Sequence, residues 1–514
     1  MSALSQTAQI AVIGAGAMGA GIAQVAAQAG HEVLLFDVAS GAAEKGRAGI
    51  LSGLSRLVER GRLSAETRDG IAARVHVAAS LEALSGAALV VEAIVEKLDV
   101  KQQLFARLEG IVESEAILAT NTSSLSITAI AAGLKHPGRV AGLHFFNPAP
   151  IMALVEIIAG LASDKQVLQT LYDTALAWGK QPVMATSTPG FIVNRVARPF
   201  YAEGLRLLEE GAGDVATIDA VLREAGSFRM GPFELMDLIG HDVNFAVTRS
   251  VFEAYFHDPR YRPSLTQQEL VAAGWLGRKS GRGFYDYAAG TQRPAPATFP
   301  PQPAPSSVVV EGDLGPAEAL VPLLQKAGIA LSRQPGEGML RLEGATLALS
   351  DGRTATARVA AGAPANLVLF DLALDYPTAA RIALTAAAQA PVEAVAQAAG
   401  LFQALGKAVS VIGDVPGLIV MRTLAMLANE ASEAVLTRVA SAADIDRAMT
   451  YGVNYPRGPL AWAQDVGPAR ILQTLEHLQA AYGEDRYRAS SHLRQRVATG
   501  QNLHAQVEAR AATS

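Results

Sequence analysis

The stretch GLHFFNP at residues 142–148 places one histidine and one asparagine in an otherwise apolar segment. The imidazole of His144, with an ordinary pKa of about 6.5, suits a general base that removes a proton at neutral pH. The competing interpretation is a core histidine whose ring nitrogens bond to the backbone. The neighbouring segments of the chain distinguish between these two interpretations.

A carboxylate follows later in the chain, in the apolar run LVEII at residues 154–158. A buried Glu156 needs a partner, and His144 is a natural one. An ionised carboxylate at this place would hold one tautomer of the imidazole and stabilise the imidazolium that forms. The alternative role for Glu156 is a structural ion pair.

A glycine-rich turn, GAGAMG at residues 14–19, joins a predicted strand at 9–13 to a predicted helix at 20–29. Gly14 allows the tight turn, Gly16 lets the backbone approach a pyrophosphate, and Gly19 lets the helix pack closely on the strand. The helix N-terminus offers free N–H groups to the anion. A dinucleotide site is therefore predicted at Gly14, Gly16, Met18 and Gly19.

A second predicted strand at residues 32–36 ends at Asp37. A carboxylate at this position can accept hydrogen bonds from both ribose hydroxyls and would repel a 2′-phosphate. The predicted cofactor is therefore NAD rather than NADP.

Further apolar runs complete a predicted parallel sheet, at residues 88–94, 116–119 and 140–146. The run at 116–119 leads into a polar turn, TNTSS at residues 120–124. Ligands of doubly wound sheets bind at the carboxyl ends of the strands, so Ser123 and His144 are expected at the ligand edge. Ser123 could equally be an ordinary turn cap.

A predicted helix at residues 42–60 and the turn after it carry basic side chains, which are Lys45, Arg47, Arg56, Arg60 and Arg62. Most of these charges are expected on a solvated face. Some could meet the phosphates of a ligand.

The composition bounds the class of protein. The chain has 514 residues, 50% hydrophobic and 18% charged, and its net charge of −5 does not suggest a nucleic-acid partner. It has no cysteine, which excludes disulfides, thiolate metal sites and cysteine nucleophiles, and no metal site is predicted. No basic region precedes an apolar core at the N-terminus and no apolar run approaches ~18 residues, so a cytoplasmic protein is expected.

Five segments are predicted along the chain. They are a doubly wound α/β domain at residues 1–186, a helical domain at 187–288, a Pro-rich linker at 289–315, a small degenerate α/β region at 316–412 and a second helical domain at 413–514. The linker is predicted from TQRPAPATFPPQPAPSS at residues 291–307.

An internal repeat supports the second helical domain. One constant shift along the chain aligns PG at 189–190 with PG at 416–417, GP at 231–232 with GP at 458–459, and AY at 254–255 with AY at 481–482. The copy has Met421 where the first module has Asn194, and it contains no HFFN stretch. It is expected to be structural and to cover the first module, rather than to form a second active site.

The motifs together resemble the L-3-hydroxyacyl-CoA dehydrogenase family. They cover residues 9–287 and are GAGAMGAGIA, VVEAIVE, NTSSLSIT, GLHFFNP, LVEII, TPGFIVNR, GPFELMDLIG and GRKSGRGFY. The resemblance implies a Rossmann-type sheet followed by an all-α domain like that of 6-phosphogluconate dehydrogenase. The long form, with two such modules, is similar to the 3-hydroxyadipyl-CoA dehydrogenases of phenylacetate degradation.

The resemblance also implies roles for residues at matching positions. His144 is implied as the base and Glu156 as its partner, while Ser123 and Asn194 bracket the C3 oxygen and the thioester of the substrate. Asn194 could instead be an N-cap-like residue of its helix. The implied NAD contacts, besides the fingerprint, Asp37 and Ser123, are Glu96, Lys101, Asn147 and Lys279. A CoA contact is implied at Arg60, whereas Gly53 departs from the family pattern.

The predicted activity is the reversible, NAD-dependent oxidation of a (3S)-3-hydroxyacyl-CoA to a 3-oxoacyl-CoA. The favoured substrate is 3-hydroxyadipyl-CoA, and 3-hydroxybutyryl-CoA or general fatty-acyl β-oxidation remains the alternative. A dehydrogenase of free β-hydroxy acids is disfavoured because no lysine stands near Asn194. A non-catalytic, crystallin-like NAD-binding protein is the alternative of another class.

Two features stay open in the sequence. Arg195, Arg198 and Arg229 could bind an adipyl carboxylate, although helix arginines are usually solvated or paired. The chain could dimerise through its helical domains, or the duplicate could take the place of that partner. The remaining histidines, which are His31, His76, His136, His241 and His257, are expected on surfaces or loops.

Overall fold

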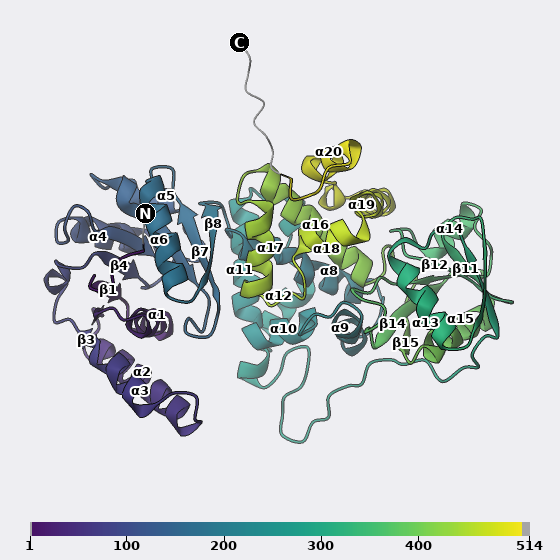
Figure 1. The fold of residues 1–514 in the computed structure, drawn as a ribbon, viewed down its shortest axis with the longest axis horizontal. Coiled ribbons are helices and arrows are strands. Elements are labelled where there is room, and N and C mark those ends of the chain that lie inside the picture. Colours follow the sequence, from purple (N-terminus) through teal and green to yellow (C-terminus); the bar gives the residue numbers. More distant parts are fainter. Residues whose placement is uncertain (1–2, 506–514) are drawn as a thin grey trace, which may run out of the picture. The chain divides into compact units, whose positions relative to one another are not determined.

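The computed structural model describes residues 3–505 (Figure 1). The chain divides into two compact units. The first unit comprises Met1–Arg195 with Arg438–Val453, and the second comprises Val196–Thr437 with Asn454–Ser514. Among the described residues, none of the helices combines the length and apolar character that crossing a membrane requires.

The first unit is built on an eight-stranded sheet in the order β3-β2-β1-β4-β5-β6-β7-β8. Neighbouring strands run parallel except for the antiparallel pair β6–β7. The strands are β1 (Ile10–Ile13), β2 (Val33–Phe36), β3 (Val75–Val77), β4 (Leu89–Glu92), β5 (Ile117–Thr120), β6 (Val140–Phe145), β7 (Leu154–Ala159) and β8 (Gln181–Thr186).

The central strands are apolar because both faces of the sheet are covered. Every residue of β1, β4, β5 and β6 is buried. The helices of this unit are α1 (Ala17–Gln28), α2 (Ala42–Glu59), α3 (Ala65–Ala73), α4 (Leu98–Glu109), α5 (Ile127–Ala131), α6 (Lys165–Ala177), α7 (Val193–Val196) and α17 (Ala442–Gly452). The order and direction of β1 to β6 are those of a Rossmann-type sheet, which confirms the predicted fold class.

Helix α17 belongs in sequence to the second helical module but folds with the first unit. It packs on β7 and β8, and its buried residues Ile445, Ala448, Met449 and Gly452 form one stripe at helical spacing. A Cβ on Gly452 would collide with Leu154 of β7, so the absence of a side chain lets the helix approach the strand. The first unit therefore takes in residues that lie within the segment predicted as the second helical domain.

The second unit contains the remaining helices and a seven-stranded sheet. Its helices are α8 (Arg198–Glu209), α9 (Val215–Glu224), α10 (Pro232–Ile239), α11 (His241–Ala254), α12 (Leu265–Ala272), α13 (Leu320–Lys326), α14 (Ala355–Ala360), α15 (Val392–Ala404), α16 (Val420–Leu436), α18 (Pro459–Val466), α19 (Pro468–Tyr482) and α20 (Ser491–Thr499). Helix α16, almost wholly buried, packs against α8, α18, α19 and α20.

The sheet of the second unit has the order β10-β9-β11-β12-β13-β14-β15. Its strands are β9 (Ser307–Glu311), β10 (Ala330–Gln334), β11 (Met339–Arg341), β12 (Thr346–Leu349), β13 (Leu367–Phe370), β14 (Arg381–Ala386) and β15 (Ala408–Val411). Strands β10 to β15 lie within the small α/β region predicted at residues 316–412, and β9 precedes that region.

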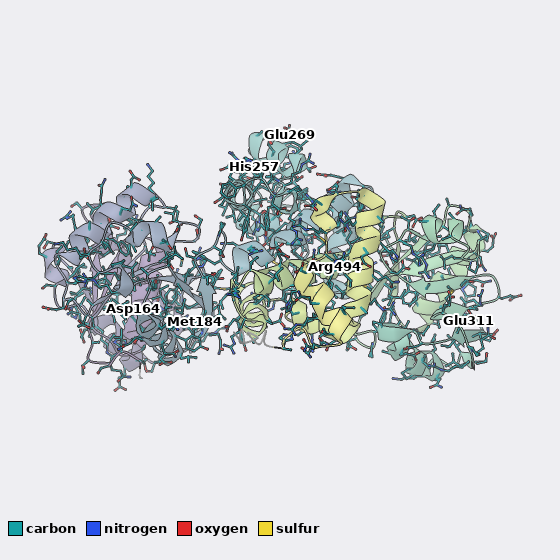
Figure 2. The ribbon with its side chains drawn as sticks, turned by 90° about the horizontal axis from the view of Figure 1, so that it is seen from above. Asp164, Met184, His257, Glu269, Glu311 and Arg494 are labelled. Carbon is teal, nitrogen blue, oxygen red and sulfur yellow. The ribbon has the colours of Figure 1, made fainter. Side chains whose placement is uncertain are left out.

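The predicted linker at 289–315 is wrong at its C-terminal end, because residues 307–311 form β9. The apolar valines of β9 are central in a sheet, paired with β10 and β11. Glu311, labelled in Figure 2, accepts hydrogen bonds from Arg341 at 2.6 Å and Gln334 at 2.6 Å, which ties β9 to both neighbours.

Candidate active site

The glycine turn lies at the carboxyl end of β1, where α1 begins. Gly14 has a φ of +98°, and a Cβ on it would lie 2.5 Å from the carbonyl oxygen of Ala93. A Cβ on Gly19 would collide with the carbonyl of Gly14, so the glycine lets α1 approach the turn. A Cβ on Gly16 would meet nothing within 4 Å, which leaves the helix N-terminus open to a phosphate.

Asp37 lies at the end of β2, beside this turn. Its carboxylate accepts the backbone N–H of Ala15 at 2.7 Å and that of Ala39 at 2.9 Å. Both oxygens are fixed at the mouth of the turn, where a carboxylate can meet ribose hydroxyls. The residues present therefore fit a nicotinamide adenine dinucleotide.

A cavity of about 840 Å³ extends from this turn along α2. Gly16 and Asp37 line it, as do Lys45, Gly53 and Arg56 of α2. Arg60, the residue implied as a CoA contact, caps the exposed C-terminal end of α2 and does not line this cavity. Gly53 leaves open space beside Lys45 and Arg56, the two cations that can meet a ligand's phosphates.

Glu96 binds the polar turn after β5. Its Oε1 accepts the hydroxyl of Thr122 at 2.5 Å, and the backbone N–H and the hydroxyl of Ser123 at 2.9 and 3.3 Å. Burial opposes ionisation of Glu96, but the hydrogen bond from Thr122 and the charge of Lys101 outweigh it and lower the pKa. The structure thus brings Glu96, Lys101 and Ser123 together, as the sequence predicts for one site.

Glu92, at the end of β4, is a partner of Lys101 that the sequence analysis does not predict. It is fully buried and accepts hydrogen bonds from Lys101 at 2.5 Å, from Thr120 at 2.7 Å and from the N–H of Ile94 at 2.7 Å. Lys101 is only 1% exposed and lies 3.3 Å from Glu96. The ammonium group of Lys101 thus lies between the carboxylates of Glu92 and Glu96 and connects the end of β4 to the residue that holds the Ser123 turn.

His144 and Glu156 face each other across the antiparallel strands β6 and β7. The Nδ1 of His144 lies 2.7 Å from Oε2 of Glu156, and the two residues are 5% and 1% exposed. The other oxygen of Glu156 accepts the N–H groups of Ile192 and Val193 at 3.1 and 3.0 Å, where α7 begins. One carboxylate therefore fixes the imidazole and the start of the helix that carries Asn194.

The arrangement resolves which nitrogen of His144 can act. An ionised carboxylate only accepts hydrogen bonds, so Nδ1 must donate to Glu156, and Nε2 keeps a lone pair. The rings of Phe146 and Phe191 lie 4.5 and 5.8 Å from the imidazole and shield it from water. His144 can therefore accept a proton at Nε2, as a general base must.

The other predicted site residues are less buried. Asn194 lies in α7 and is partly exposed, and Asn147 is exposed directly after β6. Lys279 belongs to the second unit, where it pairs with Asp242 at 2.5 Å.

Two histidines expected on surfaces or loops are buried instead. His241 bonds to Asp237 at 2.7 Å, on the adjoining helix, and both side chains are fully buried. His31 packs against Trp178 and bonds to the carbonyl of Ala8. Their partners lie on neighbouring helices and loops. The residues next to each histidine in the sequence therefore do not show that it is buried.

Comparison with known proteins matches family models to most of the chain. The model of the 3-hydroxyacyl-CoA dehydrogenase NAD binding domain matches residues 9–188, and that of the C-terminal domain matches residues 190–287 and again 417–509. The reduced Rossmann-fold domain of 3-hydroxybutyryl-CoA dehydrogenase matches residues 347–416. The two C-terminal matches start at positions 190 and 417, which the internal repeat also aligns, and this confirms the predicted duplication.

Relatives match over the whole chain or over its first half. The 3-hydroxyadipyl-CoA dehydrogenase of Escherichia coli (strain K12) is 47% identical over 95% of this chain and 97% of its own. Human mitochondrial hydroxyacyl-coenzyme A dehydrogenase is 41% identical over 54% of this chain and 90% of its own. A solved 3-hydroxybutyryl-CoA dehydrogenase from E. coli K12 has a TM-score of 0.88 and 45% identity, covering 96% of this chain and 98% of its own.

Proposed function

The chain belongs to the 3-hydroxyacyl-CoA dehydrogenase family, and from this premise we propose that it oxidises (3S)-3-hydroxyadipyl-CoA to 3-oxoadipyl-CoA. The family makes it an NAD-dependent oxidoreductase that acts on acyl-CoA. The observation that carries the proposal is the buried pair of His144 and Glu156, 2.7 Å apart at the carboxyl end of β6.

His144 removes the proton of the C3 hydroxyl through Nε2 as the C3–H bond breaks. NAD⁺, when bound, accepts that hydrogen with its electron pair, so the C3 oxygen must lose its proton for the carbonyl to form. The imidazole gains a positive charge, which Glu156 stabilises through Nδ1. In the reverse direction the imidazolium returns the proton to the alkoxide oxygen.

Ser123 and Asn194 position the substrate by neutral hydrogen bonds to the C3 oxygen and the thioester. Ser123 stands on a turn that Glu96 holds, and Asn194 directly follows Val193, whose backbone N–H bonds to Glu156. We propose that the cofactor is contacted by Asp37, Glu96 and Lys101. Asn147 and Lys279 are further contacts that the resemblance implies.

The acyl group is the part of the proposal that rests on relatives. The long relative named for 3-hydroxyadipyl-CoA supports a carboxylate-ended substrate, whereas the solved structure is named for 3-hydroxybutyryl-CoA. The test is kcat/KM for NAD⁺ reduction with 3-hydroxyadipyl-CoA, 3-hydroxybutyryl-CoA and free 3-hydroxybutyrate. We expect the adipyl thioester to be preferred and the free acid to be inert. Equal or better use of the butyryl thioester would overturn the substrate, and activity on neither thioester would overturn the proposed activity.

A cytoplasmic location and self-association through the helical domains belong to the same proposal. Light scattering coupled to size exclusion measures the mass against the 53.6 kDa of one chain. A mass of one chain at micromolar concentration would overturn the dimer and favour the duplicate as the replacement for a partner.

A further inference from the structure

Helix α17 comes from the second helical module but covers the strand that carries Glu156. It packs on β7 and β8 within the first unit. Ser441 caps its first turn by accepting the backbone N–H of Asp444 at 3.1 Å, and its last residue is Gly452. The unit that holds His144 thus includes a helix from the second half of the chain.

Polar contacts fix the position of α17 on the sheet. The backbone N–H of Thr186, at the end of β8, donates to the carbonyl of Val439 at 2.8 Å. Arg447 of α17 donates through Nη1 to the hydroxyl of Tyr172 at 3.2 Å and to the carbonyl of Pro182 at 3.4 Å. These contacts hold the segment before the helix and its middle. A larger side chain at its last turn therefore has to displace the residues that it meets.

Gly452 lies against the two segments that hold the carboxylate of Glu156. A Cβ at this position would lie 2.5 Å from Cδ2 of Leu154 and 3.1 Å from Cγ2 of Val193. Leu154 begins β7, two residues before Glu156, and is fully buried. The N–H of Val193 donates to Glu156 at 3.0 Å, and Asn194 follows it in the chain. The last residue of α17 therefore lies where β7 meets the start of α7.

The backbone of Gly452 does not require a glycine. Its φ lies outside the left-handed region, and the residue belongs to the helix. Glycine weakens a helix relative to alanine, because it has more conformational freedom to lose. The close approach of Leu154 and Val193 is thus the feature that favours glycine at this position.

The second unit has the equivalent helix with a side chain in this place. The shift that aligns Pro189 with Pro416 makes α9 the equivalent of α17 and β14 the equivalent of β7, and α9 packs on β14. Ala225 stands at the position of Gly452 and is fully buried. A methyl group therefore fits at this position in the half of the repeat that lacks the acid–base pair.

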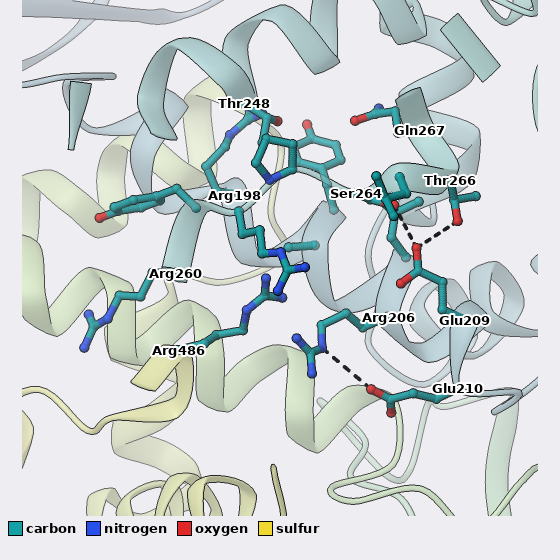
Figure 3. A pocket seen from close by; sticks show the side chains of 17 residues that line it. Arg198, Arg206, Glu209, Glu210, Thr248, Arg260, Ser264, Thr266, Gln267 and Arg486 are labelled. Atoms are coloured by element: carbon teal, nitrogen blue, oxygen red, sulfur yellow. Dashed lines mark hydrogen bonds and ion pairs between the residues drawn. The ribbon is translucent and has the colours of Figure 1, made fainter. Parts of the chain in front are cut away.

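The second unit also contains a cavity of about 420 Å³, shown in Figure 3. Its glutamates are occupied by neighbouring side chains. Glu209 accepts the hydroxyls of Ser264 and Thr266 at 2.8 Å each. Glu210 pairs with Arg206 at 3.6 Å. Of the described residues that line this cavity, none is predicted to contact the cofactor or C3, so it is α17 that brings the second module to the acid–base pair.

We propose that α17 positions the acid–base pair, and that Gly452 sets the separation of β7 and α7 at which Glu156 keeps its hydrogen bonds. Gly452 is a positioning residue, since it acts through Leu154 and Val193. The second module is then required for turnover and not only for packing. This inference rests on the proposed function, because it concerns the pair that acts on C3.

The test enlarges the side chain at position 452 in the full chain, with the thioester that the parent oxidises best. In Gly452→Ala the new Cβ has to displace Leu154 or Val193, and we expect kcat to fall on the order of tenfold. Gly452→Val adds two further methyl groups and should lower kcat on the order of 100-fold, because a misplacement of about 1 Å can cost that much in rate. The Kd for NADH should stay that of the parent, since the glycine turn follows β1, which β4, β5 and β6 separate from β7.

The matched control makes the same substitutions at Gly70, a glycine of α3. A Cβ on Gly70 would meet nothing within 4 Å. Gly70→Ala and Gly70→Val should keep kcat within about twofold of the parental value. The stoichiometry of NADH binding counts the folded molecules, and kcat is expressed per bound NADH. A loss of folded protein therefore does not register as a loss of kcat.

A second substitution restores the space in the variant. Leu154→Val removes Cδ2, the atom nearest to the new Cβ, and valine suits a strand. In the Gly452→Ala background we expect Leu154→Val to return kcat to within about threefold of that of Leu154→Val alone. If Gly452 only contributed to packing, the losses from the two substitutions would add.

Three results would overturn this inference, and they separate it from the proposed function. If Gly452→Val keeps a near-parental kcat per bound NADH while His144→Gln loses it, only the role of α17 falls. If the losses in Gly452→Ala and Leu154→Val add, Gly452 is a packing residue and again only this inference falls. If His144→Gln itself keeps a near-parental kcat, the proposed acid–base pair and this inference both fall.

Discussion

The two halves of the internal repeat end equivalent strands with different side chains. His144 of the first half faces Glu156. The shift that aligns the two halves places Asp371 at the position of His144 and Ala383 at that of Glu156, and the N–H of Asp371 bonds to the carbonyl of Ala383. The acid–base pair of the first half has become a lone carboxylate at the position of the histidine.

The lone carboxylate keeps one of the two tasks of Glu156. Asp371 accepts the N–H groups of Ile419, Val420 and Met421 at 3.0, 2.7 and 3.1 Å, at the start of α16. Ile419 and Val420 correspond to Ile192 and Val193, which bond to Glu156. Both halves thus place an acidic side chain under this helix start, whereas only the first half has the imidazole.

The second half has also kept polar contacts of the first half. Lys180 donates to the carbonyls of Ala149 and Met152, and its counterpart Lys407 donates to those of Tyr376 and Ala379. The retained contacts are those that satisfy buried backbone groups. The repeat therefore extends upstream into the strands, and the second copy has Asp371, Ala383 and Met421 at the positions of His144, Glu156 and Asn194.

The largest expected effect is on kcat, and it is tested by substituting the two equivalent positions, His144 and Asp371. His144→Gln should lower kcat by about 10²–10⁴-fold, because no group then accepts the C3 proton. The variant should still fold and bind NADH, measured by fluorescence titration. Asp371→Asn, its matched control, should keep kcat close to that of the parent.

Two results would contradict this division of roles. Near-parental kcat in His144→Gln would remove the histidine from the proton path. A comparable loss of kcat in Asp371→Asn, with the protein still folded, would mean that the second half contributes to chemistry.

The sequence predicts the first half well because its signals are local. The GAGAMG turn, Asp37 and the apolar strands need no knowledge of distant residues, and the structure places each where its pattern predicts. The pairing of His144 with Glu156 was predictable because both lie in apolar runs that form neighbouring strands.

The contacts that sequence reasoning missed depend on tertiary structure. Glu92 lies in a run that otherwise reads as a buried strand, and Lys101, its partner, follows on a separate helix. Helix α17 packs on β7 and β8, although the first helical module and the whole second sheet lie between them in the chain.

The second test concerns stability and uses the carboxylate that replaces the histidine. Burial raises the pKa of Asp371 to about 6, although backbone N–H donors work against the shift. The unfolded chain loses this proton near a pKa of about 3.9, so the folded protein binds the extra proton between roughly pH 4 and pH 6. The stabilisation is present below that window and is lost as the pH rises through it.

Urea unfolding of the parent and of Asp371→Asn across this window measures the effect. The free energy of unfolding of the parent, relative to that of the variant, should fall by about 3 kcal/mol between pH 4 and pH 7. Parallel curves would show that Asp371 titrates normally and that its burial in the second half is not as the structure has it.

The smallest expected effect lies where the two helical modules bind each other. Tyr261 of the first module donates to Glu430 of the second at 2.6 Å, and Tyr487 of the second donates to Glu203 of the first at 3.1 Å. Glu203 and Glu430 are equivalent positions of the repeat. A tyrosine of each module therefore binds the equivalent glutamate of the other module. Such reciprocity is the pattern of an isologous dimer interface, here within one chain.

Because the two contacts are equivalent, removing either hydroxyl should cost about 1 kcal/mol of unfolding free energy. Tyr487→Phe should cost at least as much as Tyr261→Phe, since the hydroxyl of Tyr487 also accepts a hydrogen bond from Arg422 at 2.8 Å. Urea unfolding compares the two variants, and kcat should not change in either. If both substitutions leave the unfolding free energy unchanged, the reciprocal contacts add no stability, and the duplicate cannot be understood as a stabilising partner carried within the chain.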